Sequence, residues 1–207
     1  MFADWKTALA DIRAARVATM RAHLDAALAN GIGDGTGAVT LEIGCGHGHF
    51  LTAYAAAHPD KQCIGVDLLA NRIERANRKR GRAALSNLVY AKGEASELLD
   101  ALPQSARLVE IFFLFPDPWP KKRHHKNRFI QTAMLDRLAA LSVPDVTRLY
   151  FRTDHAGYFS WTAALVGQHP AWRVLDGTDW PFEHETMFSL RAAGSYQSLI
   201  AQRRSAA

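Results

Sequence analysis

The sequence has little cysteine and no long uninterrupted apolar run, and each shortage excludes a class of protein. Two cysteines, Cys45 and Cys63, are too few for the disulfide framework of a small secreted domain. No apolar stretch approaches the ~20 residues that a membrane span requires. The first 30 residues contain three aspartates, unlike a signal peptide with its apolar centre. We therefore expect a cytoplasmic protein that does not associate with membranes.

Length and charge bound the organisation of the chain. Its 207 residues, 48% of them hydrophobic, supply one sizeable core and predict a single domain over residues 1–207. We expect residues 1–37 to form a helical N-terminal extension and residues 38–204 to form an α/β core. Lysine and arginine number 25 against 20 acidic residues, a net charge of +5. Much of the positive charge is concentrated in residues 72–82 and 121–128, which indicates an anionic partner.

Apolar residues predict alternating strands and helices after an N-terminal helical segment. Residues 2–28 carry apolar side chains near helical spacing, and a glycine-rich turn at residues 30–37 follows. Short apolar runs typical of buried strands then occur at residues 39–43, 63–66, 88–90, 108–114 and 147–151. Such alternation predicts an α/β fold with a doubly wound, mostly parallel sheet. Residues 182–200 either add a late antiparallel strand or pack on a second subunit, so a monomer and a homodimer both stay open.

Glycines at alternate positions follow the first predicted strand. Gly44, Gly46 and Gly48 let the backbone turn tightly and approach a ligand where any Cβ would clash. The next predicted strand ends at Asp67, from which a carboxylate can accept hydrogen bonds from both hydroxyls of a ribose. Glu94, after the third predicted strand, lies at the sheet edge that an adenine ring would meet. Together these residues predict a cofactor that contains a nucleoside.

The acid before these glycines selects the kind of cofactor. Glu42 would repel a pyrophosphate but attract an ammonium or sulfonium cation. The dinucleotide fingerprint G-x-G-x-x-G also fails, because His49 stands at its sixth position. S-adenosylmethionine therefore fits better than a nicotinamide dinucleotide, and a nicotinamide-dependent oxidoreductase is disfavoured.

Each of these residues also has a purely structural interpretation. The glycines could form only a helix-packing turn, and Asp67 could cap the helix predicted at residues 68–82. Glu94 could be only an acid at a helix start. Cys45 could be a nucleophile, but no base accompanies it, so a small apolar filler is the better interpretation. The sequence leaves the alternatives for the glycines, Asp67 and Glu94 open.

Residues 116–128 are the most informative stretch of the chain. Prolines at 116, 118 and 120 forbid a helix and predict a stiff, extended backbone that presents Asp117 and Trp119 at the carboxyl edge of the sheet. A stiff loop beside a cofactor is a catalytic position, so Asp117 is the candidate catalytic residue. Trp119 either stacks on a base or anchors the loop in the core.

Positive charge follows these prolines. Five of the eight residues after Pro120 are lysine or arginine, a density that self-repels unless phosphates or solvent neutralise it. The run is therefore an RNA-contacting surface or a solvated face, and its place beside the predicted cofactor favours RNA. A second basic run at residues 72–82 also favours RNA as the partner. His124 and His125 lack the further partners of a zinc site, so we expect no metal.

Five motifs resemble, in order and approximate spacing, those of the bacterial tRNA (guanine-N7-)-methyltransferases. They are residues 41–48, 65–67, 115–128, 152–154 and 186–188. The string Pro-Asp-Pro-Trp-Pro-Lys-Lys-Arg-His-His-Lys is highly specific, and the likeness covers about residues 39–204. The resemblance implies a Rossmann-like class I methyltransferase fold with a seven-stranded sheet. It also implies an enzyme that uses S-adenosylmethionine to methylate guanine N7 in tRNA, in the variable loop.

Roles for individual residues follow from the motifs and the resemblance together. The residues expected at the cofactor are Glu42, Gly44, Gly46, Gly48, Asp67, Glu94 and Asp117, of which Asp117 is also expected to act in catalysis. Those implied to contact the substrate guanosine are Lys121, Asp154, Thr186 and Ser189. Those implied to contact RNA are Lys122, Arg123, His124, His125, Lys126 and Arg128.

Two positions depart from the family's pattern. Ser189 stands where the later motif normally has a glutamate, and Asn127 replaces a usual arginine. These departures motivate an alternative, a catalytically impaired or divergent RNA-binding paralogue. A class I methyltransferase acting on another substrate is the third interpretation.

Overall fold

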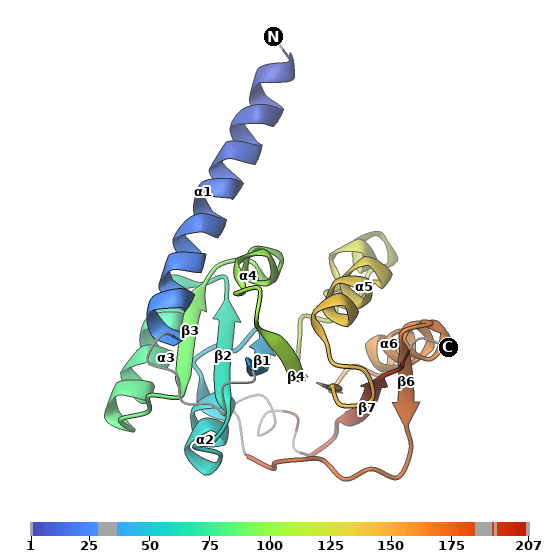
Figure 1. The fold of residues 1–207 in the computed structure, drawn as a ribbon. Coiled ribbons are helices and arrows are strands. Elements are labelled where there is room, and N and C mark those ends of the chain that lie inside the picture. The colour runs from blue at the N-terminus through green and yellow to red at the C-terminus, as the bar shows by residue number, and fades with distance from the viewer. Residues whose placement is uncertain (1, 29–36, 185–191, 193, 206–207) are drawn as a thin grey trace.

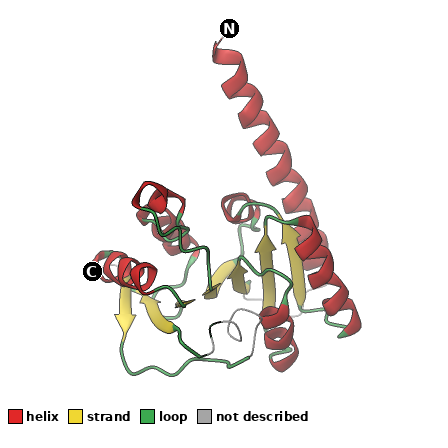
Figure 2. Cartoon of the chain, turned by 180° about the vertical axis from the view of Figure 1, so that it is seen from behind, coloured by secondary structure: helices red, strands yellow, loops and turns green. Residues whose placement is uncertain are grey.

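A long helix opens the chain and leaves the body of the protein. In the computed structural model, which describes residues 2–28, 37–184, 192 and 194–205, α1 (Phe2–Leu28) is a single helix. Figures 1 and 2 show its N-terminal half extending beyond the rest of the fold. Met20 and Leu24 are buried in the core, whereas Leu9 and Ile12 are exposed. The predicted helix is confirmed, but only its C-terminal half packs. The glycine-rich turn predicted next lies almost wholly outside the described residues.

Seven strands form one sheet, in the order β3-β2-β1-β4-β5-β7-β6. Their bounds are β1 (Ala38–Ile43), β2 (Gln62–Asp67), β3 (Leu88–Lys92), β4 (Arg107–Leu114), β5 (Arg148–Thr153), β6 (Trp172–Leu175) and β7 (Gln197–Arg203). β1 to β5 pair in parallel, and β7 is antiparallel to both β5 and β6. The predicted doubly wound, mostly parallel sheet is confirmed. β7 is the late antiparallel strand, and β6 is a strand that the apolar pattern does not predict.

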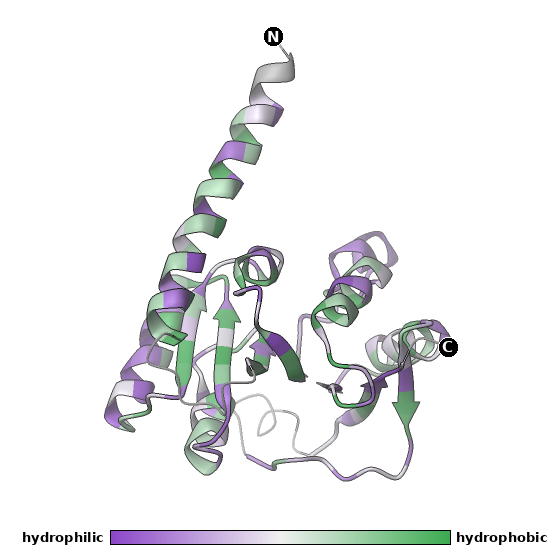
Figure 3. Ribbon diagram, viewed as in Figure 1, coloured by the Kyte–Doolittle hydropathy of each residue, from purple (hydrophilic) through white to green (hydrophobic). Residues whose placement is uncertain are grey.

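Helices cover both faces of this sheet. Their bounds are α2 (His49–Ala57), α3 (Ala70–Arg82), α4 (Ala95–Ala101), α5 (Thr132–Leu141) and α6 (Ala156–Gln168), with a short 3-10 helix η1 (Lys122–Asn127). α1, α4, α5 and α6 pack into the apolar cluster of one face, and α2 and α3 into that of the other. From Ile111 to Leu114 of β4 the side chains alternate between the two clusters, as strand geometry requires. Figure 3 shows the contrast between the apolar strands and the strongly hydrophilic α3. Among the described residues, none of the helices combines the length and hydropathy of a membrane span.

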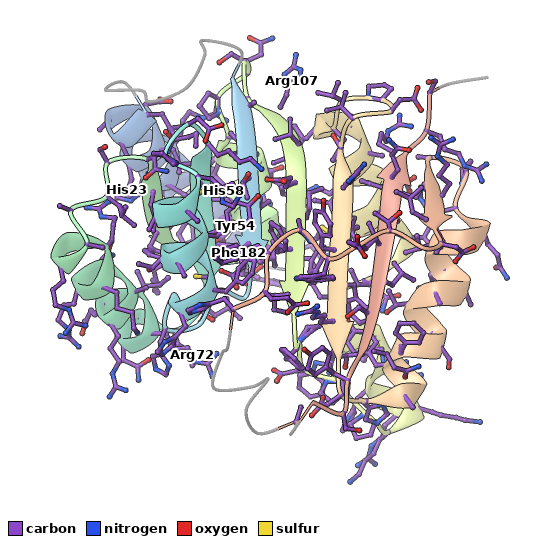
Figure 4. All side chains as sticks on the ribbon, turned by 90° about the horizontal axis from the view of Figure 1, so that it is seen from below. His23, Tyr54, His58, Arg72, Arg107 and Phe182 are labelled. Atoms are coloured by element: carbon purple, nitrogen blue, oxygen red, sulfur yellow. The ribbon has the colours of Figure 1, made fainter. Side chains whose placement is uncertain are left out.

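The irregular segment 176–184 covers part of the α2 face. Trp180 packs edge-on against Tyr150 of β5, with 5.5 Å between ring centroids. Phe182 packs edge-on against Tyr54 of α2 at 5.4 Å, and Figure 4 shows the two side chains next to each other. Trp180 also meets Phe112 of β4 at 6.4 Å, so it covers part of β4 and β5 on this face, and Phe182 joins the segment to α2.

The strand order reverses at β1. The chain moves outward from β1 to β2 and β3, and then adds β4 on the other side of β1. In open α/β sheets, such a switch point at the carboxyl ends of the strands is where ligands bind. The glycine loop follows β1 and the proline-rich segment follows β4, so the topology brings two predicted motifs to one place.

Candidate active site

The glycine loop after β1 is held against the end of β2. The backbone amides of Gly44 and Cys45 both donate to the Val66 carbonyl oxygen, at 2.9 and 3.0 Å. Gly46 has a φ of 53°, in the left-handed region that favours glycine. Apart from its own chain neighbours, a Cβ placed on Gly44 or Gly46 would meet no atom of the described residues within 4 Å. Open space therefore lies beside both glycines, as a loop that cradles a ligand requires.

Gly48 has a different environment. A Cβ at this residue would come within 2.5 Å of the Tyr90 hydroxyl oxygen, and that hydroxyl donates to the Gly48 carbonyl at 3.1 Å. Gly48 is also the N-cap of α2. The helix-packing interpretation therefore fits Gly48, while Gly44 and Gly46 keep the space that a cofactor needs.

Glu42 is a buried carboxyl group with an unused acceptor atom. Its side chain is part of a residue only 3% exposed, and its Oε2 has no hydrogen-bond partner among the described residues. Burial raises the pKa of Glu42 to about 8, although a hydrogen bond with the Leu51 backbone opposes the shift. A cation brought to this carboxyl would stabilise its charged form. The chemistry of this acid therefore fits a cationic cofactor.

Asp67 organises the glycine loop and the start of α3 at the same time. Its carboxylate accepts hydrogen bonds from the amides of Gly46 and Leu69, at 3.1 and 2.9 Å. Arg72 donates a third, longer one at 3.3 Å. The bond from Leu69, directly before α3, fits the capping interpretation. Since two carboxylate oxygens offer about four acceptor positions, Asp67 keeps capacity for a ligand hydroxyl.

Glu94 begins α4. The residue is exposed, its side chain accepts from the Glu97 amide, and the Glu97 carboxyl accepts from the Glu94 amide at 3.4 Å. This reciprocal pair is a capping box. The helix-start interpretation of Glu94 is confirmed, and its contact with an adenine ring stays a prediction.

Neither a reactive thiol nor a metal cluster marks the site. Cys45 is buried, and burial raises the pKa of its thiol well above the usual range, so the thiol is neutral near pH 7. The interpretation of Cys45 as a small apolar filler is confirmed. Within the described ranges, no three histidine, cysteine or acidic side chains gather as metal ligands would.

The proline-rich segment after β4 turns at two residues. Phe115 and Trp119 have φ values of 52° and 43°, a conformation that is uncommon and strained for residues with a side chain. The segment is thus not helical, as predicted, but it turns at these two residues and is not extended throughout, which the sequence prediction did not foresee. Trp119 is half-buried, meets the His124 ring edge-on at 5.8 Å, and belongs to neither apolar cluster of the described residues. Its geometry therefore does not support an anchor in the core.

Arg128, predicted to contact RNA, makes its contacts within the chain. The residue is only 4% exposed, and its Nε donates to the Pro118 carbonyl oxygen at 2.9 Å. Its guanidinium lies over the rings of Tyr158 and Trp161, 4.9 and 5.2 Å from their centroids. This cation is used within the chain, where it ties the proline-rich segment to α6. A run of basic residues in the sequence does not reveal which of them is buried.

The other basic residues of the run form a short exposed surface. They lie on η1, a 3-10 helix where the sequence suggests only a loop. Lys122, Arg123 and Lys126 are exposed, as is Lys121 directly before the helix. His124 and His125 are half-buried, and the His125 ring meets Trp161 edge-on at 5.3 Å.

Two predicted acids leave the sheet from neighbouring strands. Leu114 at the end of β4 pairs with Arg152 near the end of β5, so Asp117 and Asp154 follow adjacent strand ends. Both acids are exposed. Burial raises the pKa of the Tyr158 hydroxyl, and the charge of nearby Asp117 adds to the effect. Pro118, next to Asp117, accepts a hydrogen bond from Arg128, whose guanidinium lies over Tyr158 of α6, so Asp117 lies near the start of α6.

Arg152 is a residue to which the sequence analysis gave no role. Its guanidinium lies 3.7 Å from the Trp180 ring centroid and 5.0 Å from that of Tyr196, and it forms an ion pair with Glu183. Its carbonyl oxygen accepts from the Phe115 amide at 2.8 Å. Arg152 therefore joins the strand end before Asp154, the start of the proline-rich segment and two C-terminal segments. A basic residue within a buried apolar strand was the signal in the sequence.

Thr186 and Ser189, predicted to contact the guanosine, lie outside the described residues. Glu183 and Tyr196, which flank that part of the chain in sequence, both meet Arg152. The two segments on either side of the later motif are thus attached to one side chain at the carboxyl edge of the sheet.

Solved structures define the class of fold. The aminoglycoside resistance methyltransferase NpmB1 has a TM-score of 0.61 to this chain, at 18% identity, over 88% of this chain and 93% of that one. An rRNA methylase from Streptococcus thermophilus has a TM-score of 0.55 at 9% identity, over 86% and 93%. Together with the seven-stranded sheet and its strand order, these likenesses define the Rossmann-like class I methyltransferase fold.

Sequence comparison then shows the family. A family model described as "Putative methyltransferase" matches residues 36–200, and the chain belongs to that family. A tRNA (guanine-N(7)-)-methyltransferase of Rhodospirillum rubrum is 40% identical over 142 residues, 68% of this chain and 55% of the relative. One of Caulobacter vibrioides is 37% identical over 139 residues, 67% and 61%. The chain thus matches little more than half the length of these curated relatives.

Proposed function

We propose that this protein transfers a methyl group from S-adenosylmethionine to N7 of a guanine in tRNA, in the variable loop. One observation carries the proposal. The acid and glycine loop after β1 and the Asp117 loop with its exposed cations after β4 meet at the switch point of one sheet. Two relatives with this activity in their names, at 37 to 40% identity, support it.

The β1 and β2 side is where we place the cofactor. S-adenosylmethionine supplies a methyl group on a positively charged sulfur that a lone pair can attack. Glu42, with its buried unpartnered oxygen, would bind the cofactor's ammonium group. Asp67 would accept a ribose hydroxyl at its remaining acceptor position, Glu94 would meet the adenine, and Gly44 and Gly46 would leave room for the ligand.

Guanine N7 is an unprotonated lone pair, so its methylation needs no base to remove a proton first. Positioning therefore supplies most of the catalysis. As the methyl group moves, positive charge develops on the guanine ring, and a fixed carboxylate beside the base stabilises it. Asp117 is that carboxylate, and Asp154 assists from the neighbouring strand end. Both can accept hydrogen bonds from the N1–H and amino groups that distinguish guanine from adenine.

The exposed cations around η1 would hold the RNA strand. Lys121 would bind at the guanosine, while Lys122, Arg123 and Lys126 would bind flanking phosphates, because each lysine or arginine that meets a phosphate releases a condensed counterion. Trp119 would stack on a base from its half-buried position. Thr186 and Ser189 would complete the guanosine contacts, with the shorter Ser189 in place of the family's glutamate.

A second candidate is an RNA-binding paralogue without catalysis, favoured by Asn127, an exposed amide at the end of η1 where the family usually has arginine. Titration with S-adenosylmethionine separates the two. Binding of tRNA without binding of S-adenosylmethionine would favour the paralogue.

Methyl transfer tests the leading proposal. The protein is incubated with unmodified tRNA transcripts and S-adenosylmethionine, and the digested RNA is analysed by mass spectrometry. We expect 7-methylguanosine at one position. Its absence alongside measured binding of S-adenosylmethionine would refute the proposal.

A further inference from the structure

α3 carries an unusual surplus of positive charge. Six of its 13 residues are lysine or arginine and only one is acidic. Ile73 and Ala76 are buried against the sheet, while Ala70 at the start of the helix is exposed. The rest of the helix is therefore a mostly polar surface, and Figure 3 shows α3 as the strongly hydrophilic helix at the lower left, beside β3.

Three arginines form a row on the outer side of α3. Arg75, Arg78 and Arg82 are exposed, and their spacing of three and four residues puts them on one face of the helix. Among the described residues, none of the three forms an ion pair with an acidic side chain. At about 1.5 Å per residue, the row is about 10 Å long, so its three guanidinium groups can reach more than one phosphate of an RNA strand.

A second row points from α3 toward the glycine loop. Arg72 pairs with Asp67 at 3.3 Å, and the Lys79 amine donates to the His47 carbonyl oxygen at 2.7 Å. These two contacts fix α3 against the loop that we assign to the cofactor. Figure 4 shows Arg72 at the end of the sheet opposite Arg107.

The basic side chains of α3 lie close enough to repel one another. Burial lowers the pKa of Lys79, and the charges of Arg82, Arg75 and Arg78 lower it further. Such repulsion is relieved when an anion binds across the row. Arginine suits phosphate in particular, because its planar guanidinium can donate two parallel hydrogen bonds.

We propose that Arg75, Arg78 and Arg82 of α3 bind backbone phosphates of the RNA substrate, on the cofactor side of the site. The inference rests on the proposed function, since it takes the partner to be the same RNA. The cations around η1 would then hold the strand after β4, and α3 would hold a second part of the RNA beyond β2. A membrane surface fits less well, because the row within α3 has no apolar side chain to insert, and the exposed Leu68 and Leu69 lie only before the first turn of the helix.

Binding of an unmodified tRNA transcript over a range of salt concentrations tests the inference. In the variant R75Q/R78Q/R82Q we expect the Kd to rise at least tenfold. We also expect the slope of log affinity against log salt to fall by about two to three, because each phosphate contact contributes about 0.7 to 0.9. The charge-conserving variant R75K/R78K/R82K should keep most of the affinity.

A matched control separates contact from net charge. R107Q/R148Q/R173Q removes the same three charges from exposed positions on β4, β5 and β6. Arg148 and Arg173 flank Gln202 from both sides, away from the switch point. We expect affinity within twofold of the parent protein. Equal losses in both triple variants, or an unchanged salt slope in the α3 variant, would overturn the inference.

Failure of the inference and failure of the proposed function are distinguishable. S-adenosylmethionine binding, measured in every variant, confirms that the fold is intact. If the parent protein forms 7-methylguanosine while the α3 variant keeps full tRNA affinity, the function stands and the inference is wrong. If the parent protein forms none but the α3 variant loses its RNA affinity, the function fails and the inference stands.

Discussion

The guanidinium of Arg152 donates two hydrogen bonds to the carboxylate of Glu183, at 2.7 and 2.5 Å. The two partners differ in environment, since 9% of the Arg152 side chain is exposed against 64% for Glu183. The Arg152 guanidinium also lies over the rings of Trp180 and Tyr196, in a buried position near the end of β5. This pair attaches the C-terminal segments to the strand end that precedes Asp154.

Loss of Arg152 should impair turnover more than cofactor binding. In Arg152→Gln the C-terminal segments lose their attachment beside Asp154, so we expect kcat for tRNA to fall ten- to a hundredfold. The Kd for S-adenosylmethionine, which binds on the β1 and β2 side, should stay within threefold. Steady-state kinetics with tRNA and calorimetric cofactor titration check this, and a parallel loss of cofactor affinity would show a general folding defect instead.

The same pair predicts a dependence of stability on pH. Hydrogen bonding to Arg152 lowers the pKa of Glu183 below its usual 4.5. The stabilisation is therefore present above pH 4.5 and is lost as the pH falls through the lower pKa of the folded state. A double-mutant cycle of Arg152→Gln and Glu183→Gln should give a coupling of about 1 kcal/mol or less at neutral pH, since Glu183 is well exposed. Coupling that does not decline as the pH falls below 4.5 would contradict the pairing.

Glu42 should make stability and cofactor affinity vary with pH in opposite directions. Its pKa is about 8 in the folded protein against 4.5 for the free side chain. Between these values the folded state holds a proton that the unfolded state releases, so without cofactor the stability falls as the pH rises from 4.5 to 8. Only the ionised carboxyl attracts an ammonium group, so affinity for S-adenosylmethionine should rise over the upper part of that window.

The variant Glu42→Gln tests both effects. We expect it to be more stable than the parent protein at pH 9, by a few kcal/mol at most, and similar to it at pH 5. Its affinity for S-adenosylmethionine should be at least tenfold weaker at pH 8 and nearly independent of pH. Thermal unfolding and titration at several pH values measure this, and an unchanged affinity would remove Glu42 from the cofactor site.

Asp117→Asn should separate catalysis from docking. The amide keeps the size of the side chain but not the charge that stabilises a developing cation, so turnover should fall about a hundredfold or more. Affinity for tRNA should be largely kept, because the phosphate-binding cations are unchanged. Single-turnover rates and tRNA binding provide the comparison. A loss of binding in proportion to the loss of rate would make Asp117 a docking residue only.

Removing charge from α3 should stabilise the free protein. Arg75 and Arg78 take part in repulsive pairs with Arg72, Lys79, Arg82 and each other at helical spacings of three and four, and only Arg78 faces an attractive partner, Glu74. At about 0.2 to 0.5 kcal/mol per pair, R75Q/R78Q should gain about 1 kcal/mol. Since Gln has nearly the helix propensity of Arg, the backbone contributes little. The gain should shrink in 1 M salt, and a variant destabilised at low salt would contradict the repulsion.

The strands and the site motifs were predictable because both leave local signals. Buried parallel strands are continuous apolar runs, and the glycines near Asp67 and the prolines around Asp117 fix backbone shape at specific positions. β6 was missed because Trp172–Leu175 is short and carries an exposed Arg173. Its place in the sheet depends on pairing with β7, a distant segment that local patterns do not reveal.

Burial of charged side chains was the main property that the sequence did not reveal. Arg128 belongs to a basic run by its letters, yet Tyr158 and Trp161, some 30 residues further on, provide the site that buries it. In α1 the apolar spacing overestimated burial. Trp5, Leu9 and Ile12 follow the helical period of the buried Met20 and Leu24, but they remain exposed. Periodicity shows which face is apolar and not whether anything packs against it.

Replacement of the target guanine in a tRNA transcript by 7-deazaguanine tests the central claim most directly. This base lacks N7 but keeps the N1–H and amino groups that Asp117 and Asp154 are proposed to bind. The account predicts that tRNA affinity is unchanged within twofold, while methyl transfer, measured by mass spectrometry against the unsubstituted transcript, disappears. Methylation of the 7-deazaguanine transcript at a rate close to that of normal tRNA would contradict the account.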